Sequence, residues 1–385
     1  MLSSMSSLRI GIMDPLIAAR PAAETFTRVS YLGARAARVD SFWVPDHLNA
    51  LFPRSLWSPK YSDAARIVPT ADAVLEPWTM LGHIAARNRF RRMSLGIGVT
   101  DAGRRNPAVT AQAAATLHLL TRGRTILGIG PGEREGNEPY GVDWTKPVSR
   151  FEEAMATIRA LWDSKGELVT RDSPFFPLRN AVFDLPQYKG TWPQIWIAGH
   201  GPRMLRAVGR YGDGFFPAFP HSPQEYAQRL DAVRSAASDA GRDPMKIMPA
   251  IWMMTVAGRT AEDVDEALEC EVIKAFGLAA SDEFFAKYGA QHPLGVGFAG
   301  AQDLTPQEMS EQEALSYVKK IPTEVVRNGL LTGTPAEIAE RVAEWRDNGV
   351  RYVVLANIGP MQRHLRKGLA SAVAFAQAVS RIRRL

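Results

Sequence analysis

The 385-residue chain contains a single cysteine, Cys270. One thiol cannot form an internal disulfide or a multi-thiolate metal centre, which excludes a disulfide scaffold and a zinc ribbon. So little cysteine fits a reducing compartment. We therefore expect a cytoplasmic protein that needs no metal.

Long apolar runs and an excess of one charge are also absent. No uninterrupted apolar stretch approaches the roughly 18 residues of a membrane span, and the N-terminal segment lacks the basic start and apolar run of a signal peptide. The 46 basic and 40 acidic residues are interspersed, so a nucleic-acid partner is not expected. The one basic cluster, SRIRRL at the C-terminus, leaves a peripheral membrane contact open beside the alternative of a solvated last helical turn.

Short apolar runs alternate with amphipathic stretches from one end of the chain to the other. The strand candidates cover residues 8–13, 41–45, 93–99, 125–130, 194–198, 214–218, 247–256 and 351–356. Alternating strands and helices are typical of repeated βα units around a parallel sheet, and eight such strands can close a barrel. The sequence therefore predicts a single (β/α)8 TIM barrel over residues 1–385.

Three helix starts are marked by capping residues. Asn106 precedes Pro107, Ser222 precedes Pro223, and Thr334 with Glu337 forms a capping box. In the first of these helices the apolar residues recur on one predicted face, at Val109, Ala113, Leu117 and Leu120.

Two long segments interrupt the regular spacing. Residues 47–75 and 277–330 are far longer than ordinary connections, and in a barrel enzyme such insertions usually shape or cover a pocket. Leu48, Phe52 and Trp57 in the first segment could be ordinary core residues or the wall of a groove for alkyl chains.

The stretch ILGIGPGEREGNEPYG, residues 126–141, raises the question of a dinucleotide-binding loop. That motif requires a third glycine three residues after Gly130, where this chain has Glu133, and a helix directly after the loop, whereas the next strong helix signal is near Ser149. The stretch is therefore better interpreted as a strand followed by a long loop at the catalytic end of a barrel. Glu133 is a candidate acid there, although the neighbouring Glu135 and Glu138 blur that assignment.

Two further places carry candidate chemistry. His47, beside Asp46, follows the second strand, where a histidine can exchange a proton near neutral pH or can simply pack against backbone. AGHGPRM, residues 198–204, joins a strand to a helix whose free amides could bind an anion, or it is a plain connection. Arg104 and Arg105 are expected to form a solvated loop.

Four motifs together resemble the luciferase-like barrel superfamily, and the similarity is collinear over essentially the whole chain. They are FWVPDHL, LGIGVTDAGRRNPAVTAQAAATL, RTILGIGPGEREGNEPYG and IWIAGHGPRMLRAVGRYGDGF. The Asp46–His47 pair and the NPAV helix start are most similar to members that use the deazaflavin coenzyme F420.

This resemblance implies roles for particular residues. It implies that His47 is catalytic, that Glu133 lies near the substrate and that Asp46 hydrogen-bonds the deazaflavin ring. It also implies a bulge with a non-proline cis peptide that presses on that ring, at Ile97, Gly98 and Val99. The cofactor's phosphate would be held around Ala198, Gly199, His200, Gly201 and Pro202.

The resemblance further implies a reaction and an assembly. Reduced F420 would give a hydride to the keto group of a very long, wax-like lipid, and the chain would form a homodimer. The alternatives are an FMN-dependent monooxygenase of the same fold, an F420-dependent sugar-phosphate or alcohol dehydrogenase, and a non-catalytic carrier of lipid or cofactor.

Overall fold

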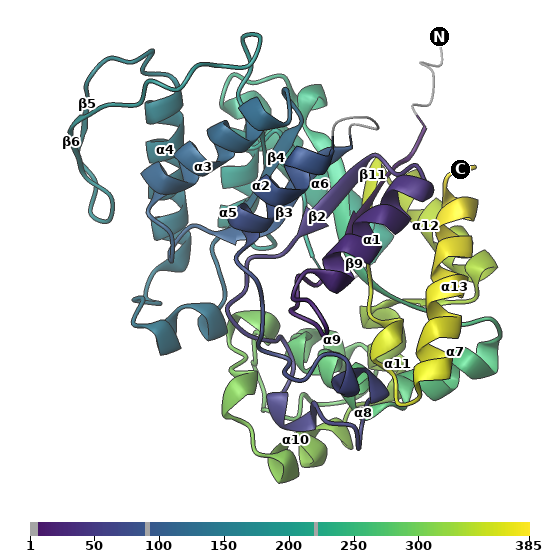
Figure 1. Ribbon diagram of the computed structural model, residues 1–385. Helices are drawn as coiled ribbons and strands as arrows, with labels where there is room; N and C mark the ends of the chain where they lie inside the picture. The colour runs from purple at the N-terminus through teal and green to yellow at the C-terminus, as the bar shows by residue number, and fades with distance from the viewer. Residues whose placement is uncertain (1–6, 89–92, 219–221) are drawn as a thin grey trace.

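The computed structural model describes residues 7–88, 93–218 and 222–385 (Figure 1). Its main sheet consists of β1 (Arg9–Met13), β2 (Ser41–Val44), β3 (Ser94–Asp101), β4 (Thr125–Gly130), β7 (Gln194–Ile197), β8 (Gly214–Phe215), β9 (Met248–Ala257), β10 (Leu331–Gly333) and β11 (Tyr352–Asn357). All pairings in this sheet are parallel, and the order β1-β2-β3-β4-β7-β8-β9-β11 returns to β1. The predicted eight-stranded barrel is confirmed.

Each of the eight predicted strands is present. β10 was not predicted, because it is a three-residue strand that pairs only with the last residues of β9, outside the closed ring. The antiparallel hairpin of β5 (Val169–Arg171) and β6 (Leu178–Ala181) was also missed. It protrudes beyond α4 in Figure 1, and its partly exposed residues carry no strong alternating pattern.

The helices surround the barrel and cap one of its ends. They are α1 (Thr25–Ala36), α2 (Pro77–Arg87), α3 (Pro107–Leu120), α4 (Pro147–Trp162), α5 (Pro202–Tyr211), α6 (Pro223–Asp239), α7 (Ala261–Leu268), α8 (Glu271–Lys274), α9 (Asp282–Ala286), α10 (Glu311–Val318), α11 (Thr323–Gly329), α12 (Pro335–Asp347) and α13 (Leu365–Ile382). The three predicted caps are confirmed: Asn106 and Ser222 accept backbone amides, and Thr334 forms the full capping box with Glu337.

The predicted apolar face of α3 is only partly buried. Leu117 is buried, but Val109 and Leu120 are 56% and 59% exposed, and the other buried positions include Ala111, Ala114 and Ala115. Small alanine side chains let α3 approach its neighbours closely, so the buried face of this helix is not centred on the predicted residues.

Aromatic side chains fill the barrel interior. Trp43 lies with its ring centroid 5.3 Å from that of Trp196 and 4.9 Å from that of Phe216. Glycines on the neighbouring strands make room for these rings, since a Cβ on Gly96 would lie 2.3 Å from Trp43. The lumen is a packed core rather than a channel, which leaves the mouth of the barrel as the place for a site.

The two long segments meet at one end of the barrel. Residues 47–75 contain the short helices η1 (Arg54–Leu56) and η2 (Asp63–Arg66), and residues 277–330 contain α9, α10 and α11. The Tyr61 hydroxyl donates to Glu311 at 2.6 Å, and both segments share one hydrophobic cluster, distinct from the cluster between the barrel strands and their helices. Both lie at the lower end of the molecule in Figure 1. The assignment of the whole chain to a single domain stays a prediction.

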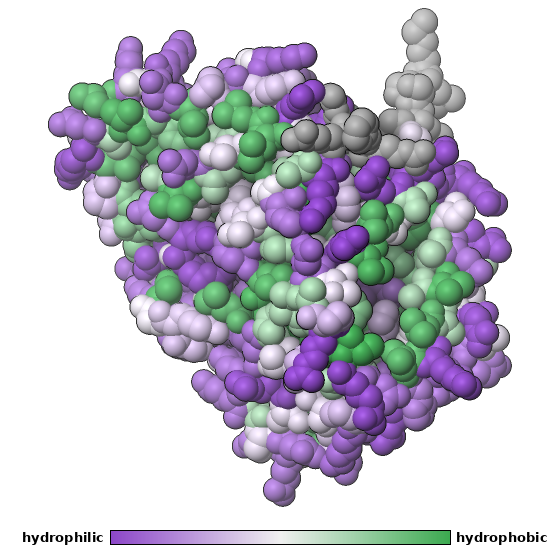
Figure 2. All heavy atoms as spheres, viewed as in Figure 1, coloured by the Kyte–Doolittle hydropathy of each residue, from purple (hydrophilic) through white to green (hydrophobic). Residues whose placement is uncertain are grey.

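Figure 2 shows hydrophilic side chains over much of the visible surface, with apolar side chains gathered over α1 and α13. The most exposed of them on these two helices are Val29, Leu32, Leu369 and Val373. Among the described helices, none combines the length and apolar character needed to cross a membrane.

Candidate active site

The ends of four adjacent strands form one part of the wall of a cavity. β2, β3, β4 and β7 end beside one another, because parallel strands present their carboxyl ends at the same rim. The cavity has a volume of about 630 Å³, within the range of pockets that enclose a small-molecule ligand. Ten of the eleven residues predicted for the site line it: Asp46, His47, Gly98, Val99, Glu133, Ala198, Gly199, His200, Gly201 and Pro202.

Ile97 is the exception. Its side chain is 1% exposed and packs in the core between the strands and the helices. Successive strand residues point to opposite faces, and β3 keeps its regular pairing with β4 up to Ile97. The side chain therefore faces away from the cavity.

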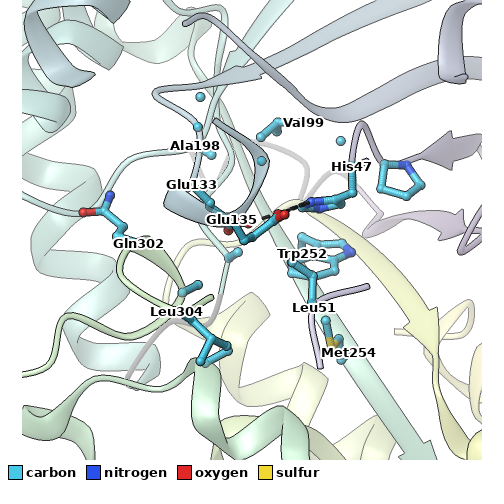
Figure 3. A pocket seen from close by; sticks show the side chains of 18 of the residues that line it. His47, Leu51, Val99, Glu133, Glu135, Ala198, Trp252, Met254, Gln302 and Leu304 are labelled. Carbon is cyan, nitrogen blue, oxygen red and sulfur yellow. Dashed lines mark hydrogen bonds and ion pairs between the residues drawn. The ribbon is translucent and has the colours of Figure 1, made fainter. Parts of the chain in front are cut away.

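His47 and Glu135 form the central pair of the site. His47 Nδ1 lies 3.0 Å from Glu135 Oε1, and the Glu135 side chain is only 2% exposed (Figure 3). Burial lowers the pKa of His47, but the hydrogen bond and negative charge of Glu135, with the charge of Glu133, raise that pKa to about 9. The imidazole is therefore protonated at neutral pH. Nδ1–H donates to Glu135, which leaves Nε2–H as the second donor.

Glu133 approaches the same histidine less closely. Its Oε2 lies 3.9 Å from His47 Nδ1, and its side chain is 30% exposed. Burial raises the pKa of Glu133, and so do the negative charges of Glu135 and Asp101. The positive charge of His47 lowers it, and the net result is a pKa of about 7. Glu133 can thus be protonated or charged near neutral pH. Oε2 of Glu133 and Oε2 of Glu135 are both buried and have no hydrogen-bond partner among the described residues.

Asp46 is held by two arginines. Arg104 donates to Oδ1 of Asp46 at 2.8 Å, Arg105 donates to Oδ2 at 2.8 Å, and the Thr100 hydroxyl donates to Oδ2 at 2.6 Å. Burial raises the pKa of Asp46, but these hydrogen bonds and charges bring it below its usual value. The expectation of a solvated loop at Arg104 and Arg105 was wrong, since their side chains are 11% and 25% exposed and anchor the residue before His47. The predicted contact of Asp46 with a cofactor ring stays a prediction.

A second buried carboxylate shapes the loop that carries the glutamates. Asp101 accepts the backbone amides of Gly103 and Arg104 at 2.6 and 3.0 Å and the side-chain amide of Asn137. Asn137 also donates to the backbone oxygen of Glu133 at 2.8 Å. Gly132 has φ +90°, and a Cβ there would lie 2.2 Å from Asp101, so only glycine fits. These bonds fix the turn that places Glu133 and Glu135 in the cavity.

The predicted bulge in β3 is confirmed. The pairing of β3 with β4 shifts between Ile97 and Thr100, and the Gly98–Val99 peptide is cis. Gly98 and Val99 both line the cavity, and a Cβ on Gly128 of the neighbouring strand would lie 2.0 Å from the Ile97 backbone oxygen. Contact between this bulge and a cofactor ring stays a prediction.

The segment from Ala198 to Pro202 joins β7 to the N-terminus of α5 at the cavity rim. Gly201 is the N-cap of α5 and no side chain caps the helix there. Cationic groups lie nearby, since Arg229 is 3.3 Å from His200 Nδ1, and Arg203, ion-paired to Glu152, lines the cavity. A helix N-terminus with adjacent guanidinium groups fits an anion, although phosphate binding here stays a prediction.

The sequence missed several residues of this site. Glu135 is one of three glutamates within residues 133–138, and nothing in that stretch of sequence distinguishes it from the other two. Trp252 and Met254 lie inside a strand and look like ordinary core residues, yet both line the cavity (Figure 3). Of the three apolar residues considered for a groove, Phe52 and Trp57 line the cavity, and Leu48 is 40% exposed and does not.

The parallel barrel and the ionisable side chains at its strand ends together define the class of protein. The luciferase-like monooxygenase family model matches residues 20–352, and the chain belongs to this family. Solved structures agree on the fold. An F420-dependent secondary alcohol dehydrogenase in complex with an F420-acetone adduct is similar with a TM-score of 0.72 and 17% identity, covering 98% of this chain and 99% of that one.

Sequence relatives are more specific. The chain is 68% identical over 381 residues to a phthiodiolone/phenolphthiodiolone dimycocerosates ketoreductase of Mycobacterium sp. (strain JLS), covering 99% of this chain and 100% of that protein. It is 54% identical over 382 residues to the protein of the same name from Mycobacterium bovis (strain BCG / Pasteur 1173P2), with the same coverage. A 5,10-methylenetetrahydromethanopterin reductase of Methanolobus tindarius is 27% identical over 70% of this chain and 78% of its own length.

Proposed function

We propose that the chain is an F420-dependent ketoreductase that reduces the keto group of a long-chain lipid of the phthiodiolone dimycocerosate type. The observation that carries this proposal is the 3.0 Å contact of His47 Nδ1 with the buried carboxylate of Glu135, in a cavity whose other side is apolar. The full-length identity to proteins named as ketoreductases of such lipids supports the substrate class.

The residues present fit a deazaflavin. The bulge at Gly98 and Val99 brings both residues to the cavity wall, where a ring could lie against them, and α5 with its nearby arginines offers a place for a phosphate. The buried Oε2 atoms of Glu133 and Glu135 are acceptors without a hydrogen-bond partner among the described residues, so a donor on a bound molecule would satisfy them. Bound in its reduced form, the coenzyme supplies a hydride and does not readily activate oxygen.

The protein supplies the proton and the geometry. Negative charge grows on the ketone oxygen as its carbon accepts the hydride, and Nε2–H of His47 donates to that oxygen and then transfers its proton. The carbonyl thereby becomes a secondary alcohol, and His47 becomes neutral. Glu135 keeps Nδ1 as a donor throughout, so Nε2 is the nitrogen that changes its protonation.

Glu133 is a second group beside His47 that can exchange protons with solvent. It is more exposed than Glu135, and its pKa of about 7 matches such exchange near neutral pH, but its Oε2 approaches Nδ1 of His47, at 3.9 Å, so solvent returns the proton to Nε2. The ligand atoms of His47, Glu133 and Glu135 lie within 4.8 Å of one another, a grouping that would also suit a cation. We favour the protonated imidazole, because its own charge already balances the carboxylate that contacts it.

A fluorescence titration with oxidised F420, with FMN in parallel, tests the cofactor. The proposal expects tight binding of F420 and weak binding of FMN, followed by oxidation of reduced F420 when a long-chain ketone is added. The opposite preference, with oxygen consumption in the presence of reduced FMN, would favour a monooxygenase of the same fold and refute the proposal. Assembly as a homodimer, a cytoplasmic location and a peripheral membrane contact stay predictions.

His47→Ala separates an enzyme from a carrier. An enzyme should lose turnover by about 10²- to 10⁴-fold, the usual contribution of a general acid, while F420 binding stays close to that of the wild type. A carrier would show no turnover in either protein. Exposed His364, away from the cavity, provides the matched control variant His364→Ala.

A further inference from the structure

The cavity is divided by polarity. Among the residues that the structure describes, its charged lining residues, for example Asp46, Arg104 and Glu133, all come from positions between 14 and 203, at or near strand ends. The lining residues contributed by 49–74 and by 276–361 include no charged side chain at all. One part of the cavity therefore suits charged and reacting groups, and the other suits only a neutral ligand.

The uncharged part has firm aromatic and aliphatic walls. The Phe52 ring centroid lies 5.7 Å from that of Trp57 and 5.3 Å from that of Phe276, and all three residues line the cavity. Figure 3 shows Leu51, Met254 and Leu304 on the side of the cavity below Glu135 and His47. We call this region, bounded by residues 49–57, Met254 and residues 276–304, the apolar chamber.

Three of the polar side chains in the cavity wall are used by the protein itself, and Gln302, which also lines the cavity, is an exposed residue. Ser281 accepts the backbone amide of Phe284 as the N-cap of α9, and Asn357 accepts the amide of Gly359 at 3.2 Å. Asn49 donates to the backbone oxygen of Ala50 and to Gln307. A ligand in the chamber thus gains little from hydrogen bonds and gains mainly from removing apolar surface from water.

We propose that the apolar chamber binds the saturated alkyl chain attached to the keto carbon, an inference that rests on the proposed ketoreductase function. The chamber is continuous with the space beside His47, so a molecule whose carbonyl meets Nε2 can extend a chain directly into it. An anionic cofactor tail is not a suitable occupant, because burying a charge against uncharged walls is costly. The two segments that interrupt the barrel pattern are therefore the part of the chain that selects a lipid.

Binding of secondary alcohols to the full-length protein tests this without turnover. Isothermal titration calorimetry with 2-alkanols of six to fourteen carbons should give one site per chain, with an association constant that rises about fourfold per methylene until the chamber is full, as expected for a buried CH₂. A length-independent association constant would overturn the proposal. So would binding of several molecules per chain, because that indicates non-specific association with the exposed apolar surface.

Variants of Leu51 test where the alkyl chain binds. Leu51 is half-buried and lines the chamber, so it tolerates a change of size better than a fully buried residue. In Leu51→Trp the association constant should stop rising at a shorter alcohol, and in Leu51→Glu it should no longer change with chain length. Leu120, which is exposed on α3 and does not line the cavity, provides the matched controls Leu120→Trp and Leu120→Glu. A wild-type length dependence in Leu51→Glu would refute the location.

The same alcohols separate the inference from the proposed function. Suppose that the association constant of the alcohols rises with chain length and that this rise requires Leu51, but the matching 2-alkanones do not oxidise reduced F420. The chamber is then an alkyl site and the ketoreductase function is wrong. If the ketones are reduced at rates that ignore chain length and Leu51, the function holds and the chamber proposal fails.

Discussion

Replacing Glu135 with Gln should change the pH dependence of the enzyme more than its structure. Glutamine is close in size to glutamate and its amide oxygen can still accept the proton on His47 Nδ1, so the 3.0 Å contact can persist while the negative charge is lost. The charge and hydrogen bond of Glu135 are the main contributions that raise the pKa of His47. We expect that pKa to fall from about 9 to 6.5 or lower.

The expected loss follows from the protonated fraction. With a pKa of about 9, roughly nine-tenths of His47 is protonated at pH 8, and with a pKa of 6.5 only about 3% is. If protonated His47 is the proton donor, turnover should fall about 30-fold at pH 8 and less than about twofold at pH 6. A merely structural role for Glu135 predicts a loss that is the same at both pH values.

The assay is a pH profile of kcat together with an NMR titration of the imidazole nitrogens of His47. Glu138→Gln provides the control, because Glu138 lies in the same loop but is 57% exposed and paired with Arg134. The control should keep the wild-type profile. If the pKa of the alkaline limb of kcat in Glu135→Gln stays within about half a unit of the wild-type value, Glu135 does not set the charge of His47, and the mechanism above is wrong.

Three further predictions concern stability. Asp46→Asn leaves the buried guanidinium of Arg104 without a charge partner, while Arg105 keeps its ion pair with Glu76, and should destabilise the fold by about 3 kcal/mol, measured by urea denaturation. Gly128→Ala brings a methyl within 2.0 Å of the Ile97 backbone oxygen and should lower the melting temperature and weaken F420 binding, whereas Gly33→Ala, in α1 and away from the cavity, meets no atom within 4 Å and should do neither. The pKa of His47 is raised on folding, so its stabilising contribution is complete below pH 6.5 and is lost as the pH rises through about 9. The free energy of unfolding should fall by about 3 kcal/mol over this range, and an unchanged value would contradict the raised pKa.

Much of the fold follows from local sequence. The eight strands and the capped starts of α3, α6 and α12 were predictable because strand periodicity and helix capping depend on residues only a few positions apart. The sequence argued against a dinucleotide-binding loop on two grounds, because Glu133 stands where the motif requires glycine and no helix signal follows the loop directly. Parallel strands present their carboxyl ends at one rim of a barrel, and this rule predicted that His47 and Glu133 lie at the same rim.

The sequence by itself thus determined the barrel and the rim that carries the chemistry, and the tertiary structure decided which residues act together there. Glu135 lies 88 positions from His47 and differs from Glu133 and Glu138 only in its burial, which depends on how the loop after β4 folds against Asp101. Arg104 and Arg105 lie against Asp46 only because β2 and β3 are neighbours in the closed sheet. The apolar chamber needs segments more than 200 residues apart, and no local pattern encodes which apolar side chains line a cavity and which fill a core.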